Sequence, residues 1–158
     1  MTKTTHESII VPITPPGTDI TPVVPAQSIG AVTFQQTKSV ELLSPYVEAY
    51  YDAKENNLTI NAIVYVDSKT INENNGILNY SVIQNTYIDI DGYAQLQFFI
   101  VYDMPEELLG DLSIYEIIFE ANSDIFIGGL SKIEKIQTFL WDVDPISSRG
   151  TETTVQHG

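Results

Sequence analysis

The sequence predicts an all-β protein, a single antiparallel β-sandwich of Ig-like or jelly-roll-like type with about eight strands and an extended N-terminal arm. Apolar and polar residues alternate with a period of two in several segments of the 158-residue chain, as they do in strands that bury one face. Clusters of Asn, Asp and Gly separate these segments and are typical of turns. One short segment, 105–110, has a helical pattern, with Pro first and Gly last.

Residues 1–30 are expected to form an extended arm outside the sandwich, because five of the eight prolines lie in the first 25 residues. Proline fixes φ and lacks the N–H donor, so such a stretch cannot be a central strand. The arm also carries more branched aliphatic side chains than a fully solvated tail usually does, although a flexible linker is the alternative interpretation. We expect these side chains to contact a neighbouring subunit: Ile9, Ile10, Val11, Ile13, Ile20, Val23 and Val24.

The sandwich domain is expected to span residues 31–145. Its first strands are placed at 32–36 and 40–51, and Pro45 within the second of them indicates a bulge or an edge position. The clearest strand comes next, and its apolar residues form one buried face. They are Leu58, Ile60, Ala62, Val64 and Val66.

Two further strands are predicted at 78–83 and 87–90, followed by a longer one at 93–102. The Asp91-Gly92 pair between them is the strongest hairpin signal in the chain, because Asp-Gly suits a type I′ turn. The inward residues of the longer strand are Ala94, Leu96, Phe98, Ile100 and Tyr102.

The last strands are predicted at 112–121 and 133–143. The first of these buries its more apolar face, which carries Tyr115, Ile117 and Phe119. In the second strand the alternation is less regular. Residues 146–158 are small and polar and have no periodicity, so we expect a loose C-terminal tail.

Composition and charge exclude several classes of function. The chain has no cysteine, which excludes disulfides, Cys-ligated zinc and a Cys nucleophile. Its formal net charge of −14 opposes binding to nucleic acid and to anionic membranes. Its two histidines, His6 and His157, lie far apart in the sequence, and no phosphate loop, dinucleotide fingerprint or Gly-x-Ser-x-Gly motif is present. We therefore expect a protein that is not an enzyme.

Two pairs of carboxylates are the candidate metal ligands. Asp89 with Asp91, and Asp142 with Asp144, each have the i, i+2 spacing that lets two oxygens converge on one cation in a turn. Ca²⁺ prefers such oxygen ligands, and it is the one cofactor that the sequence suggests. The residues after Asp89 do not complete an EF-hand loop, and ordinary solvated turn acids are the alternative interpretation.

The nine tyrosines suggest a second kind of site. Exposed tyrosines on one sheet face can form a platform for sugar stacking or a protein contact. The alternative is that tyrosine is simply a good strand former whose hydroxyl reaches water.

These observations favour a non-enzymatic structural subunit that self-assembles, or decorates a larger particle such as a virion, filament or array, through its N-terminal arm. A homo-oligomer or a larger protein assembly is the expected partner. The alternative is a ligand-binding β-sandwich module for calcium-assisted carbohydrate or protein recognition. No signal peptide and no apolar run of about 20 residues is found, so we expect synthesis in the cytoplasm without membrane insertion and leave incorporation in a particle open.

Overall fold

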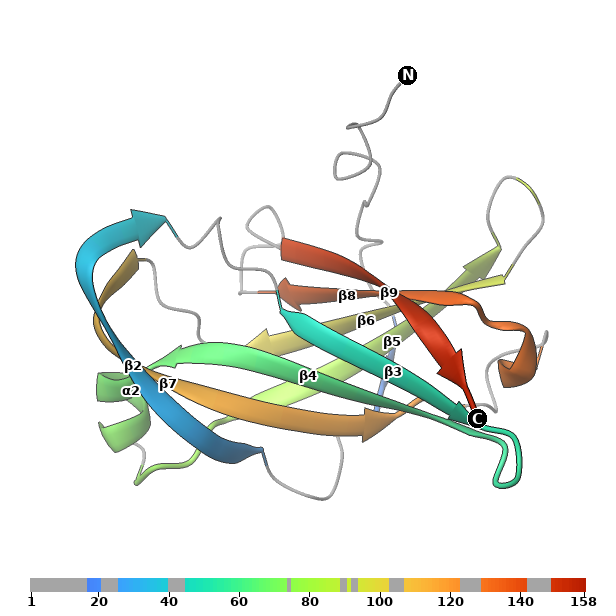
Figure 1. The fold of residues 1–158 in the computed structure, drawn as a ribbon, viewed down its shortest axis with the longest axis horizontal. Helices are drawn as coiled ribbons and strands as arrows, with labels where there is room; N and C mark the ends of the chain where they lie inside the picture. Colours follow the sequence, from blue (N-terminus) through green and yellow to red (C-terminus); the bar gives the residue numbers. More distant parts are fainter. Residues whose placement is uncertain are drawn as a thin grey trace.

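The computed structural model describes residues 17–20, 26–39, 45–73, 75–88, 91, 94–102, 107–122, 129–141 and 149–158. Nine strands form one curled, mixed sheet in the order β1-β5-β6-β8-β9-β3-β4-β7-β2 (Figure 1). The strand bounds are β1 Thr18–Asp19, β2 Gln27–Ser39, β3 Tyr46–Asp52, β4 Asn57–Asp67, β5 Tyr80–Ile88, β6 Ala94–Tyr102, β7 Glu107–Glu120, β8 Lys135–Trp141 and β9 Arg149–His157.

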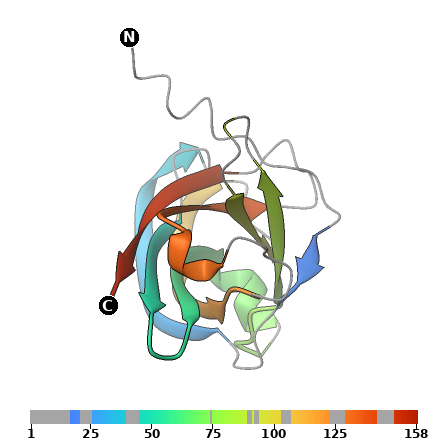
Figure 2. The same ribbon diagram turned by 90° about the vertical axis from the view of Figure 1, so that its right-hand side faces the viewer.

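Most of the described residues lie in strands, so the all-β prediction is confirmed. A single antiparallel sandwich is not confirmed, because all nine strands belong to one sheet and two of its neighbouring pairs, β6 with β8 and β3 with β9, are parallel. Viewed end-on, the sheet curls so that one group of strands faces a second group (Figure 2). The first group is β1, β5, β6 and β8, and the second is β3, β4, β7 and β2.

Strand β9 joins the two groups. Residues 149–154 pair with β8, and residues 155–157 pair with β3. The expected loose tail is therefore wrong for residues 149–157, which lie in the middle of the sheet. The sequence did not predict this strand because these residues have no apolar stripe. Backbone pairing with β8 and β3 and the strand preference of threonine hold them in the sheet.

The main core lies between the two groups, and period two predicted most of it. Every inward residue predicted for β4 is at most 1% exposed. On β7 the predicted face is also inward, and the Phe119 ring meets Phe98 of β6 edge to face at 5.1 Å. The Tyr102 hydroxyl of β6 donates a hydrogen bond of 3.1 Å to the Tyr65 carbonyl oxygen of β4, which also ties the two groups together.

Strands β5 and β6 form the hairpin that Asp91-Gly92 predicted, with Ile88 opposite Ala94. The two short strands expected at 78–83 and 87–90 are the single strand β5. Gln84 of β5 is fully buried, and its amide accepts from the Asn122 N–H at 2.8 Å and donates to the Asn122 carbonyl oxygen at 3.0 Å. The Gln84 side chain therefore makes the pair of backbone hydrogen bonds that a neighbouring strand would make, and it fixes the chain just after β7 against β5.

Helical structure lies elsewhere than the sequence predicted. Residues 107–110 of the expected helix at 105–110 begin β7 and pair with β2. The helix α2 (Ser68–Glu73) instead follows β4, and η3 (Leu130–Lys132) precedes β8. Asp67 caps α2, because its carboxylate accepts from the Lys69 N–H at 3.1 Å. In the described part of the chain, no helix has the length and apolar character that crossing a membrane requires.

Candidate binding surfaces

The described part of the arm adds a strand to the β5 edge of the sheet. Thr18 and Asp19 of β1 pair with Gln84 and Ile83 of β5, and the Ile20 N–H donates to the Val82 carbonyl oxygen at 2.8 Å. The Ile20 side chain is half-buried and packs against the main core. The other six predicted contact residues lie outside the described residues: Ile9, Ile10, Val11, Ile13, Val23 and Val24.

The opposite edge of the sheet is the long strand β2. It has 13 residues, and β7 is its one partner among the described strands. Its register shifts between Ser28 and Gly30 and between Phe34 and Lys38. Such irregularities blunt an edge against unspecific pairing. The sheet therefore has one edge covered for two residues by the arm and a second, longer edge.

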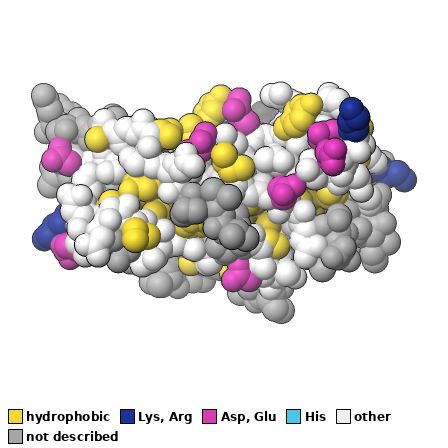
Figure 3. Space-filling view, turned by 90° about the horizontal axis from the view of Figure 1, so that it is seen from below, with side chains coloured by type: hydrophobic (Ala, Val, Ile, Leu, Met, Phe, Trp, Pro, Cys, Tyr) yellow, Lys and Arg dark blue, Asp and Glu magenta, His cyan; other side chains and the backbone are white. Residues whose placement is uncertain are grey.

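The outer face of β3, β4 and β7 carries the exposed tyrosines. Tyr46 is 63% exposed and Tyr50 is 47% exposed, and both lie on β3 on either side of Glu48. The register continues this face across β4 to β7, where Ile118 is 45% exposed. Seen from below, the molecule shows hydrophobic and acidic side chains intermixed (Figure 3).

This face is acidic as well as apolar. The register places Glu116 and Glu120 of β7 on it, together with Glu48 of β3. The Asn61 amide of β4 donates to the Glu116 carboxylate at 2.9 Å and so fixes its position. The sequences of β3, β4 and β7 contain no Lys or Arg. The face therefore suits a partner that offers apolar or aromatic groups together with positive charge or hydroxyl donors.

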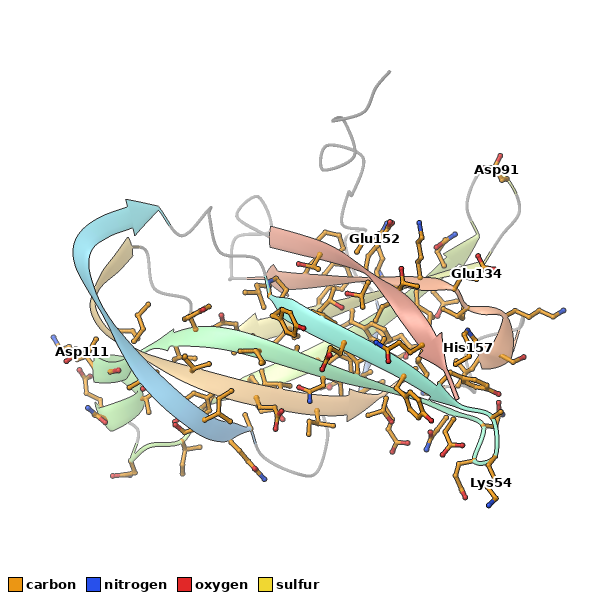
Figure 4. The ribbon with its side chains drawn as sticks, viewed as in Figure 1. Lys54, Asp91, Asp111, Glu134, Glu152 and His157 are labelled. Carbon is orange, nitrogen blue, oxygen red and sulfur yellow. The ribbon has the colours of Figure 1, made fainter. Side chains whose placement is uncertain are left out.

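The predicted metal ligands are mostly outside the described residues. Asp91 is exposed at the tip of the β5–β6 hairpin (Figure 4), whereas Asp89, Asp142 and Asp144 are not described. Within the described ranges, no three His, Cys, Asp or Glu residues are grouped as metal ligands would be. Calcium binding by these pairs stays a prediction.

The packing of His157 and the hollow beside α2 could not be predicted from the sequence. The His157 ring lies against Tyr51, with centroids 5.4 Å apart, and its Nε2 is 3.2 Å from the Ile133 carbonyl oxygen, so this histidine packs the end of β9 onto the molecule. The hollow is shallow and open and is lined by Asp67, Ser68, Lys69, Asn72, Glu73 and Asp111.

Comparison of the chain with protein-family models, with curated proteins and with solved structures found no match.

Proposed function

We propose that this protein is a non-enzymatic structural subunit that assembles with copies of itself, or onto a larger protein particle, through its N-terminal arm. The observation that carries the proposal is the pairing of β1 with β5. Residues 17–20 add a strand to the edge of the sheet and set Ile20 on the core. The arm is thus built to recognise a sheet edge, which is the mode of strand addition.

In an assembly, the arm of one subunit would make the same contacts on the β5 edge of the next. Exchange of an identical element between copies has a low free-energy cost, because the arm forms the same hydrogen bonds and packing on a neighbour as on its own chain. Pro22 and Pro25 in the connection between β1 and β2 favour an extended conformation, which suits such an exchange. Reciprocal exchange would give a dimer, and head-to-tail exchange would give a ring or a filament.

The test is the mass in solution of the full-length protein and of a variant without residues 1–25, measured by light scattering across a range of concentrations. We expect an oligomer for the full chain and a folded monomer, with an unchanged circular dichroism spectrum, for the deletion. Ile118→Ser is the matched control, because it removes an exposed isoleucine from another surface and should leave the oligomer intact. A full-length protein that is monomeric at tens of micromolar would contradict the proposal.

A ligand-binding module for carbohydrate or protein recognition is the second candidate, and the exposed Tyr46 and Tyr50 favour it. Aromatic rings spaced along one strand face can stack on sugars or receive a peptide. Calorimetric titration with soluble β-glucan oligosaccharides and with a Lys-containing peptide, each with and without Ca²⁺, would test it. This candidate requires binding that survives deletion of residues 1–25 and that is lost in Tyr46→Ala/Tyr50→Ala.

A further inference from the structure

A pair of aromatic rings, called here the aromatic cluster, lies on the outer face of the sheet, away from the main core. Phe99 of β6 and Phe139 of β8 are paired in register, and their rings stack with centroids 5.4 Å apart at 18°. Their neighbours Phe98 and Leu140 belong to the main core. Successive side chains of a strand point to opposite faces, so the two rings point outward.

These outward side chains are nevertheless buried. Phe99 is 0% exposed and Phe139 is 2% exposed, and the adjacent Gln97 on the same face is 1% exposed. The apolar side chains described as packing against the two rings are Ile83 and Val101, which belong to the same face and lie beside the rings. Side neighbours alone do not remove an outward ring from water. Burial of this face of β5, β6 and β8 therefore requires a cover in addition to these neighbours.

The first described residue of the arm, Gly17, lies beside this face. A Cβ atom at Gly17 would lie 2.6 Å from Ile83 Cγ2 and 2.6 Å from Asn85 Oδ1. Ile83 packs against the aromatic cluster, and Asn85, two residues further along β5, is on the same face. The chain just before β1 therefore meets the covered face, and at this position only glycine fits without displacing its neighbours.

We propose that the aliphatic segment 9–13 of the arm lies across the outer face of β5, β6 and β8 and covers Phe99 and Phe139. The inference rests on the proposed function, because it names the surface that receives the arm. Eight extended residues, 9–16, span roughly 26–29 Å, whereas the three strand spacings from β1 to β8 amount to about 14 Å. The sequence of the segment offers four branched aliphatic side chains and a proline, which is compatible with an extended docked conformation.

Paired cysteines test the position of the segment in the full-length, cysteine-free chain. Ile9, Ile10, Val11 and Ile13 are each replaced by Cys in combination with Val101→Cys, and disulfides formed under mild oxidation are identified by mass spectrometry of non-reduced peptides. A disulfide needs Cα atoms roughly 4.4–6.8 Å apart, so we expect one or two of the four pairs to close. Val11→Cys with Ile118→Cys is the matched control, because Ile118 is exposed on a different face.

Equal yields with the control, or no disulfide from any of the four positions to Val101→Cys or to Ile83→Cys, would overturn the inference. It would also fall if Val143→Cys or Ile146→Cys, in the connection between β8 and β9, closed onto Val101→Cys while the arm positions did not.

A second measurement does not depend on disulfide geometry. Replacing all four aliphatic residues of segment 9–13 by Ser should uncover the two rings and raise the fluorescence of the neutral dye Nile red several-fold. Adding Phe99→Thr and Phe139→Thr to that variant should abolish the increase. No increase in the first variant, or an increase that survives in the second, would overturn the inference.

Mixing two populations that each carry one of the two cysteines separates this inference from the proposed function. A disulfide between chains would support both. A disulfide within one chain together with a monomeric mass would support the docking of the segment and end the assembly proposal. An arm-dependent oligomer without any of these disulfides would keep the assembly proposal and overturn the docking surface.

Discussion

At the scale of single residues, β7 shows how much the face of a strand decides. Ile117 and Ile118 are adjacent and chemically identical, yet Ile117 is 0% exposed and Ile118 is 45% exposed. The alternation of the sequence predicted that Ile117 is inward. Most of the main core could be predicted in this way, because a strand that buries one face keeps a period of two.

Replacement of each isoleucine by Ala provides a matched pair. Ile117→Ala should lower the free energy of unfolding by about 2–5 kcal/mol, because it removes buried surface and leaves a cavity. Ile118→Ala should change it by about 0.5 kcal/mol or less. Urea denaturation of both variants measures the difference, and equal losses would contradict the assigned faces of β7.

Tyr80 provides a test by pH. Burial raises the pKa of its hydroxyl above the usual 10.0, so the folded chain keeps this proton at pH values at which the unfolded chain loses it. This difference lowers stability as the pH rises above about 10. Tyr80→Phe should therefore lose less stability than the native protein between about pH 8 and about pH 11. Ile118→Ala, at an exposed site without a titratable group, is the control and should follow the native pH dependence.

Buried residues that alternation does not explain could not be predicted. Gln84 reads as a polar strand residue, and its burial depends on the Asn122 backbone, 38 positions away in the sequence. Phe99 and Phe139 are buried on the face opposite the main core, and a period of two does not show whether the second face of a strand is buried as well.

At the scale of elements, β9 connects the two groups of strands, because six of its residues pair with β8 and three pair with β3. The sequence predicted the strands that carry a strong apolar stripe, and the β5–β6 hairpin from its turn. It missed β9 because few of its side chains are buried, and α2 because a single capped turn and a half leaves little periodic signal.

Deletion of residues 149–158 should abolish cooperative thermal unfolding. Both β8 and β3 would lose their pairing with β9, and the two groups of strands would lose their connection. The control is Glu152→Gln, which removes the 3.7 Å ion pair with Lys135 but keeps the strand. That pair is exposed, so the control should cost less than about 1 kcal/mol. Calorimetry distinguishes the two, and a sharp transition in the deletion variant would contradict the central role of β9.

At the scale of the whole molecule, the net charge of −14 opposes any assembly of identical copies. This repulsion follows from the composition alone, whereas the order of the strands could not be predicted. The parallel neighbours of the sheet are far apart in the sequence, as the hydrogen bond from Thr151 to the Pro45 carbonyl oxygen across 106 positions shows. Nothing in a local pattern specifies such a pairing.

Self-association should therefore strengthen with ionic strength. The Debye length falls from about 30 Å at 10 mM salt to about 10 Å at 100 mM, which screens repulsion between exposed carboxylates. We expect the association constant from sedimentation to rise over this range for the full chain and to stay negligible without residues 1–25. Dissociation on addition of salt would show that attraction between charges, and not the apolar arm, holds the copies together.

The position of β9 also determines when the molecule can fold during its synthesis. Its residues leave the ribosome after those of every other described strand, yet the sheet needs them at its centre. Until then, the nascent chain holds two separate groups of strands with their apolar faces exposed, a state that is prone to aggregation and attractive to chaperones. A chain released early would lack β9, would not complete its fold and would stay accessible to proteases. Completion of the fold therefore requires that translation has reached residue 157.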